Sequence, residues 1–451
     1  MKTGPIVIFK SKRLTSLFII IVLTFIANIK HQSAHPQPLS LLPSGGEVRN
    51  GQAFHTTKRG QSLYLIASKY LPLTDSYTQS GLVKELIRIN SLKKTLLPIG
   101  KELRIPVIHN GNVVAKTVSK NNDFEAKGIY ITGISAGTER IIRLASELKR
   151  LGGNTIVFDA KDMSGLIFYK SKVKLAKQIG ASEKTSIRDL NRMVYLLHKN
   201  DIHVVARIVL FHDELLAEKR PDLAVRSRST GNPWRVKGKV AWVDPSMREV
   251  QKYNLDLAKE LASFGVDEIQ FDYIRFPAMG DTDDAMYQFD ETKTPKRKII
   301  TDFLKRAYKK LKPLKVLVSI DVYGISVWDK EIDVNITGQK IQDLARYTDI
   351  ISPMLYPSHF SSYFGNKPIP ADEPYYFVYN GCKKMAELTK GTEVKIRPWL
   401  QAFPLGITHF GKDYILKEIA AAEDAATTGW LLWDAENSYK VALEALGSTN
   451  E

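Results

Sequence analysis

Carboxylates and aromatic side chains recur where short apolar segments of this sequence end. The clearest case is the segment 266–277, with the sequence VDEIQFDYIRFP. Strand-like alternation places Ile269 and Phe271 on one face of this segment, and Gln270 and Asp272 on the other. A carboxylate is costly to bury unless it has a partner or a task. Asp272 is therefore the first candidate for catalysis.

The same pattern is found at the ends of other apolar segments in the second half of the chain. These ends carry Asp159, His212, Asp321, Tyr323, Tyr356, Trp399, Trp433, Asp434 and Glu436. Carboxylates supply acid–base and nucleophilic chemistry, and flat aromatic rings pack well against sugar rings. No phosphate-binding glycine loop accompanies them. This combination indicates cleavage of glycosidic bonds.

Two carboxylates are needed for that reaction, and we assign them to neighbouring segments. Asp272 is expected to be the nucleophile or ion-stabilising carboxylate, kept ionised by Arg275. Asp321 is expected to be the proton donor, with a raised pKa. The two roles could be reversed, and other residues could supply the second carboxylate. These are Asp159, Asp434 and Glu436. Adjacent strands place two aspartates close together, which favours a retaining over an inverting reaction.

Substrate contacts are expected from side chains around the same segment ends. The candidates are Tyr273, Tyr323, Tyr356, Trp399, Trp433, Glu436 and His212. A catalytic metal is a weaker alternative, because His212-Asp213 stands alone without the spacing of a zinc site. No nucleophile elbow is present, and Cys382 falls in an expected helix. We therefore expect neither a cofactor nor a metal.

The segments that carry these residues predict a (β/α)₈ barrel over residues 127–447. Eight short apolar strands alternate with amphipathic helical stretches, which is typical of a parallel sheet covered on both faces. A doubly wound sheet is the alternative, but its nucleotide-binding turn is missing. The expected strands are 128–132, 155–159, 204–210, 268–272, 316–321, 350–355, 395–400 and 430–434.

The first part of the chain has a different organisation. Residues 1–33 combine a basic start with an apolar run, as in a signal peptide or signal anchor, and predict export to the periplasm, cell envelope or medium. Residues 34–53 and 107–126 are expected to be linkers around a compact module at 54–106. The net charge of +17 is compatible with nucleic acid or with acidic polymers. No nucleic-acid motif is present, so we favour acidic glycans or envelope polymers.

The module 54–106 resembles LysM, a β-α-α-β fold that binds glycans containing N-acetylglucosamine. The resemblance is carried by KRGQSL at 58–63, by Ile89-Asn90, and by PIGKELRIP at 98–106. The stretch 71–81 is longer than in the usual module. The resemblance implies a peptidoglycan-like or related glycan as a partner.

The barrel region resembles a bacterial glycoside-hydrolase-like domain of unknown function whose hallmark is FDYIRFP, present intact at 271–277. That resemblance implies a TIM barrel related to glycosidases. A fainter likeness to family 18 chitinases rests on 354–356 and 429–433. Their acid glutamate would stand at Ile274, so their substrate-assisted mechanism is not expected. The sequence thus predicts an exported glycosidase, with a non-catalytic glycan-binding barrel or a metal-dependent deacetylase as alternatives.

Overall fold

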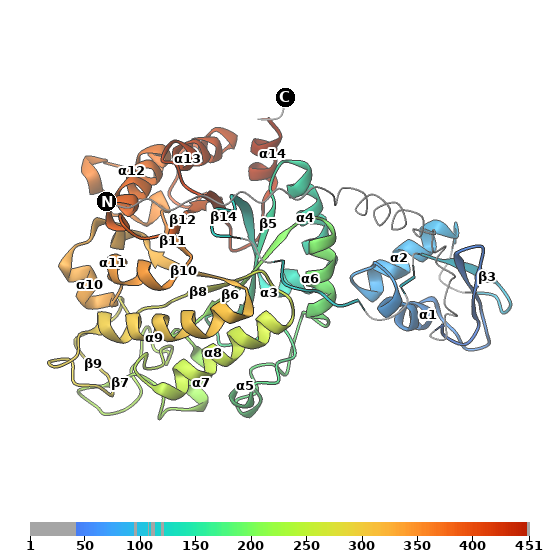
Figure 1. The fold of residues 1–451 in the computed structure, drawn as a ribbon, viewed down its shortest axis with the longest axis horizontal. Coiled ribbons are helices and arrows are strands. Elements are labelled where there is room, and N and C mark those ends of the chain that lie inside the picture. The colour runs from blue at the N-terminus through green and yellow to red at the C-terminus, as the bar shows by residue number, and fades with distance from the viewer. Residues whose placement is uncertain (1–41, 94–96, 107, 110–112, 119–120, 449–451) are drawn as a thin grey trace, which may run out of the picture.

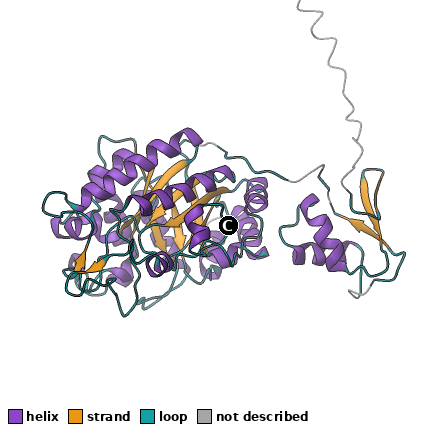
Figure 2. Cartoon of the chain, turned by 90° about the horizontal axis from the view of Figure 1, so that it is seen from below, coloured by secondary structure: helices purple, strands orange, loops and turns teal. Residues whose placement is uncertain are grey.

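The computed structural model describes residues 42–93, 97–106, 108–109, 113–118 and 121–448. The expected signal segment 1–33 lies outside these residues. A small N-terminal module is followed by a large barrel whose strands are ringed by helices (Figure 1). Seen from below, the module lies beside the barrel (Figure 2). Among the helices that the structure describes, none combines the length and the apolar character needed to cross a membrane.

The module is built from an antiparallel three-stranded sheet and two helices. In chain order these are β1 (Gly46–Arg49), β2 (Gln52–Thr56), α1 (Leu63–Tyr70), α2 (Gln79–Ile89) and β3 (Glu102–Ile105). The strand β1 lies in residues that we expected to be a linker. It forms a hairpin with β2 because Asn50 and Gly51 both adopt positive φ, at 49° and 73°, as a tight turn requires.

The residues that carry the LysM resemblance have structural roles. Ser62 caps α1 by accepting a hydrogen bond from the Leu65 backbone N–H. The Asn90 side chain joins the end of α2 to β3, because it accepts from the Arg104 N–H at 2.7 Å and donates to the Arg104 carbonyl at 2.8 Å. The Asn90 bonds thus tie the end of α2 to the sheet.

The barrel is a closed parallel sheet of eight strand positions, as predicted. The strands are β4 (Ala126–Ile131), β5 (Thr155–Lys161), β6 (His203–Val209), β8 (Glu268–Asp272), β10 (Leu317–Tyr323), β11 (Ile350–Met354), β12 (Lys395–Ile396) with β13 (Trp399–Gln401), and β14 (Gly429–Trp433). Pairing of β10 with β11 and of β14 with β4 closes the ring. The seventh position is divided because Pro398 has no N–H to donate to a neighbouring strand.

Helices surround this ring and extend its loops. They are α3 (Gly133–Ala136), α4 (Glu139–Arg150), α5 (Lys174–Gln178), α6 (Leu190–Lys199), α7 (Glu214–Lys219), α8 (Arg248–Ser263), α9 (Lys296–Leu311), α10 (Glu331–Thr337), α11 (Ile341–Leu344), α12 (Pro374–Leu388), α13 (Lys412–Asp424) and α14 (Lys440–Ser448). A two-stranded ribbon of β7 (Arg226–Ser227) and β9 (Ala285–Met286) joins the loops after β6 and β8.

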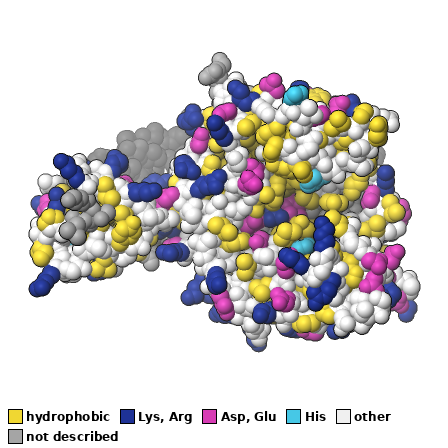
Figure 3. Space-filling model, turned by 180° about the vertical axis from the view of Figure 1, so that it is seen from behind, with side chains coloured by type: hydrophobic (Ala, Val, Ile, Leu, Met, Phe, Trp, Pro, Cys, Tyr) yellow, Lys and Arg dark blue, Asp and Glu magenta, His cyan; other side chains and the backbone are white. Residues whose placement is uncertain are grey.

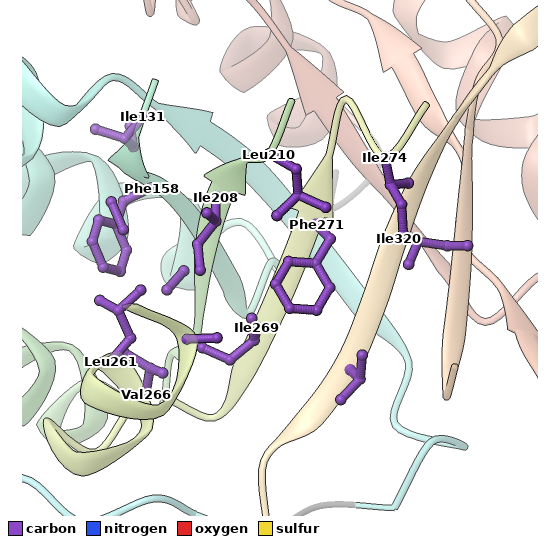
Figure 4. Packing of buried hydrophobic residues seen from close by; sticks show 14 of the residues in the cluster. Ile131, Phe158, Ile208, Leu210, Leu261, Val266, Ile269, Phe271, Ile274 and Ile320 are labelled. Carbon is purple, nitrogen blue, oxygen red and sulfur yellow. The ribbon is translucent and has the colours of Figure 1, made fainter. Parts of the chain in front are cut away.

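The two faces of strand β8 have different roles. One face packs in the apolar core, and the other carries polar side chains. Ile269 and Phe271 of β8 belong to the main apolar core (Figure 4). The Phe271 ring lies 5.9 Å from that of Phe303 on α9, which fixes this face as the one covered by helices. The opposite face of β8 points into the barrel. There Glu268 forms a fully buried ion pair with Arg397 at 3.0 Å. Asp272 therefore points inward, as the alternation predicted.

The long stretch 71–81 of the module contacts the barrel. The Tyr77 hydroxyl donates to the Ala136 carbonyl at 2.6 Å, and the Thr78 backbone N–H donates to the Glu139 carboxylate at 2.7 Å. Arg192 of α6 donates to the Thr74 carbonyl. Residues of the expected linker 107–126 also pack on the barrel, because the Val118 N–H donates to Asp267 at 2.8 Å. We refer to residues 71–81 as the docking loop.

Candidate active site

Asp272 ends β8 at the carboxyl edge of the barrel and is held by Arg207 of β6. Both Nε and Nη2 of Arg207 donate to Asp272 Oδ2, at 3.0 Å and 2.6 Å. Nη1 of the same guanidinium donates to Asp159 Oδ1 at the end of β5. Burial alone would lower the pKa of Arg207, but Asp159 and Asp272 outweigh burial and raise it well above its usual value. Arg207 is thus a permanent cation between two carboxylates.

The backbone turns sharply immediately after Asp272. Tyr273 has φ of 50°, a left-handed conformation that a bulky residue seldom adopts. Its backbone N–H donates to Asp272 Oδ1 at 2.5 Å, so both carboxylate oxygens are held. Gln339 supports the turn from the neighbouring loop by donating to the Ile274 carbonyl and accepting from the Tyr323 N–H. Strain of this kind persists where the surroundings enforce it, and it is concentrated at functional sites.

Asp321 of β10 is the strand neighbour of Asp272. The residues before them, Ile320 and Phe271, are paired in register. Asp321 Oδ1 accepts a hydrogen bond from Trp399 Nε1 at 2.8 Å, while Oδ2 has no hydrogen-bond partner among the described residues. Burial, and next the charge of Asp272, raise the pKa of Asp321 well above its usual value. Burial thus favours the protonated form of Asp321 over the ionised form.

Asp159 is buried behind Arg207. The Tyr130 hydroxyl donates to Asp159 Oδ2, and the Tyr130 ring stacks on Trp433 with centroids 3.9 Å apart. Arg207 lies over the Trp433 ring at 5.0 Å. Burial raises the pKa of Asp159 more than Arg207 and Tyr130 lower it. These residues form the wall behind Asp272.

A cleft of about 860 Å³ opens above this group. The residues that line it are Arg207, Asp272, Tyr273, Arg275, Met279, Tyr323, Gly324, Ile325, Lys330, Ile332, Asp333, Met354, Tyr356, His359, Phe360, Ser361, Phe364, Trp399 and Trp433. In the space-filling view the barrel is hollowed between margins of hydrophobic side chains, with charged and histidine side chains gathered in and around the hollow (Figure 3). Such a lining suits a sugar, which has apolar ring faces and a polar edge.

Arg275 does not hold Asp272, so that expectation was wrong. Its guanidinium lies 5.0–5.1 Å from the ring centroids of Trp242, Tyr273 and Tyr323. Among the described residues, its guanidinium makes one hydrogen bond, from Nη1 to the Phe276 carbonyl at 3.0 Å. The left-handed turn at Tyr273 explains the difference, because strand alternation does not continue past it.

Several predicted site residues lie outside the cleft lining. Asp434 caps its own loop by accepting from the Glu436 and Ser438 N–H groups, and Glu436 is exposed. The His212 ring packs against Trp242 and Tyr273. Asp213 caps α7 and forms a buried ion pair with Lys161 at 2.7 Å.

The described residues include no cluster of three or more His, Cys, Asp or Glu side chains that could hold a metal ion. His212 and Asp213, which the metal-dependent alternative requires, make the packing and capping contacts described above. The deacetylase alternative therefore has no ligand set in this part of the chain.

The cleft also contains charged residues that the sequence analysis did not single out. Arg207 interrupts an otherwise apolar strand, VVARIVL, and a lone charge within such a strand was the available signal. Asp333 and Lys330 belong to the loop after β10, where α10 brings them to the cleft. Their sequence has no feature that distinguishes it from an ordinary solvated helix.

Several solved structures resemble this chain, and one of those named here does so with a TM-score above 0.5. The glycoside hydrolase domain of PgaB (BpsB) from Bordetella bronchiseptica is 11% identical, with 71% of this chain and 98% of that chain covered and a TM-score of 0.54. A hypothetical protein from Ruminiclostridium thermocellum is 35% identical, with 43% and 97% covered and a TM-score of 0.40. The spore cortex-lytic enzyme SleL from Bacillus cereus is 11% identical, with 87% and 86% covered and a TM-score of 0.39. No curated protein matches the chain.

Family models match both parts of the chain. A LysM domain matches residues 55–106, and a domain described as "Putative glycosyl hydrolase domain" matches residues 128–439, which is more than half of the sequence. The chain therefore belongs to this glycosyl hydrolase domain family and carries a LysM domain ahead of the barrel.

Proposed function

We propose that this protein is an exported glycosidase that cleaves an envelope or extracellular polysaccharide, with Asp272 as its central carboxylate. The observation that carries the proposal is the setting of Asp272. It lies in an aromatic cleft at the carboxyl edge of the barrel, forms an ion pair with Arg207, and has as its neighbour Asp321, whose pKa burial raises well above its usual value. An ionised carboxylate beside a sugar ring can stabilise an oxocarbenium-like transition state or attack the anomeric carbon.

The proton for the leaving group must come from a second acid. Asp321 has the raised pKa of a proton donor, but it is 1% exposed and lies beneath the cleft lining. Asp333 lines the cleft directly from α10. We assign the donor role to Asp321 because it is next to Asp272, and Asp333 is the second candidate because it faces the cleft.

The LysM domain supports an N-acetylglucosamine-containing glycan, such as peptidoglycan, as the polymer on which the enzyme acts. The observed neighbours of the barrel include proteins that act on glycans, but these are distant in sequence. The envelope or extracellular location is part of the same proposal, because such polymers lie outside the cytoplasm.

The test is turnover by the purified full-length protein on a panel of bacterial polysaccharides. Asp272→Asn keeps the size of the side chain and removes the charge, so we expect turnover to fall by several orders of magnitude. Asp244→Asn is the matched control, because Asp244 is a buried aspartate outside the cleft that accepts from the Ser246 and Gln288 N–H groups. Near-parental turnover by Asp272→Asn would refute the assignment. Binding of a polysaccharide without any cleavage would favour a non-catalytic barrel.

The donor is identified by comparing Asp321→Asn with Asp333→Asn. The donor variant should lose far less turnover on aryl glycosides than on natural linkages, because an aryl leaving group needs little protonation. NMR spectroscopy that identifies the anomer released first then distinguishes a retaining from an inverting reaction.

A further inference from the structure

Arg275 is a buried cation in the cleft that is not used by the proposed reaction. It is 5% exposed, yet it lines the cleft. Three aromatic rings surround it, those of Trp242, Tyr273 and Tyr323. A guanidinium in this setting has lost water, and it forms no ion pair with a carboxylate of the described residues in return.

The hydrogen-bonding capacity of Arg275 is also largely unused. A guanidinium has five N–H donors in a planar fork. One hydrogen bond, from Nη1 to the Phe276 carbonyl, is recorded, and no other links the group to any residue that the structure describes. No ion pair joins Arg275 to a described carboxylate. Asp272, its expected partner, is instead paired with Arg207. Most of the donors are left for a ligand in the cleft.

We propose that Arg275 binds a carboxylate carried by the glycan, so that the substrate is an acidic polysaccharide. This inference rests on the proposed glycosidase function and specifies its substrate class. A planar carboxylate matches the guanidinium fork, and a buried, ring-lined site strengthens the pair by excluding water. The net charge of +17 favours approach of such a polymer. The carboxylate can belong to a uronic acid or to the lactyl group of a muramic acid.

The experiment measures binding in the Asp272→Asn background, so that no glycan is cut during titration. Two probe pairs distinguish the two sources of carboxylate. The first is an oligosaccharide of alternating glucuronic acid and N-acetylglucosamine, with its carboxyl-reduced form. The second is a peptide-free peptidoglycan strand with free lactyl carboxylates, with its methyl ester. Tighter binding of the acidic member of either pair is expected and identifies the source.

Arg275→Met should then weaken binding of the preferred acidic probe by about tenfold or more, because a charge-assisted hydrogen bond is lost. Binding of its neutral partner should change by less than about twofold on the same scale. Lys330→Met is the matched control, since it removes the same charge at another position of the cleft lining. It should leave the preference for the acidic probe in place.

Arg275→Lys covers the case in which the methionine variant does not fold. It keeps the charge but not the fork, so it should weaken the acidic probe several-fold and spare the neutral one. The proposal is overturned if acidic and neutral probes bind the parent equally, if both weaken together in the Arg275 variants, or if Lys330→Met has the same effect as Arg275→Met. None of these three results would contradict cleavage that depends on Asp272. The glycosidase proposal is therefore tested independently of this inference.

Discussion

Replacing Asp321 with asparagine should stabilise the barrel and at the same time impair catalysis. Folding raises the pKa of Asp321 well above its usual value, whereas an aspartate in the unfolded chain loses its proton near pH 3.9. A carboxyl whose pKa is raised by folding contributes fully to stability below about pH 3.9, and this contribution is lost as the pH rises toward the folded-state pKa. Asparagine has no proton to lose, and its carbonyl can still accept the bond from Trp399.

The size of the effect follows from linkage. Each pH unit above the unfolded-state pKa costs the parent up to about 1.4 kcal/mol relative to the variant. Between pH 5 and pH 7 the difference in unfolding free energy should therefore widen by up to about 2.7 kcal/mol. Urea unfolding followed by tryptophan fluorescence measures it in the barrel, because all 6 tryptophans of the chain lie there.

Asp321→Ala is the control for this experiment. It also removes the titration, but it leaves the Trp399 N–H without its acceptor at a cost of about 1–3 kcal/mol. Its curve should run parallel to that of Asp321→Asn at lower stability. If parent and Asp321→Asn give parallel curves between pH 5 and pH 7, Asp321 does not hold a proton in the fold. The reasoning about the donor would then be refuted.

Three other substitutions test the surroundings of the site. Arg207→Met leaves two buried carboxylates without their cation. Chemical denaturation should therefore show a loss of about 3–5 kcal/mol in unfolding free energy. A loss below about 1 kcal/mol would contradict the buried pairing. Burial would raise the pKa of Glu268, but Arg397 and His203 lower it to about 2. The parent should therefore lose stability as the pH falls from about 4.5 toward 2, whereas Glu268→Gln should lack this loss, as acid titration by circular dichroism would show. Glu139→Ala removes the acceptor of the Thr78 N–H and should speed hydrogen exchange at that amide, and unchanged exchange would argue against the docking contact.

The sequence was a good guide to the barrel because its short, largely apolar strands alternate with amphipathic helices. The strand 268–272 was predicted with the limits that the structure shows. The hairpin that begins the module was missed, although Asn50-Gly51 is a strong turn signal, because the polar composition around it resembles a linker. Local sequence patterns were therefore sufficient to predict most of the fold.

The site was predicted less completely because its contacts join different strands. Arg207 reaches Asp272 across 65 positions of sequence, and no local pattern specifies that pair. Arg275 was assigned to Asp272 from proximity in sequence, but the left-handed Tyr273 redirects the chain between them. Conversely, the position of Asp321 beside Asp272 could be predicted, because the ends of adjacent parallel strands meet at one edge of the sheet.

The docking loop changes how the two parts of this protein can share one polymer. Modules on free linkers search a volume, and their gain in avidity depends on linker length. Here the Tyr77 and Thr78 contacts set a constant separation between the LysM domain and the cleft. A glycan held by both would have to span that separation. The separation therefore sets the minimum length of a glycan that can occupy both places at once. Glycans shorter than this separation would gain no avidity. Longer glycans would be cleaved at a constant distance from the part bound by the LysM domain.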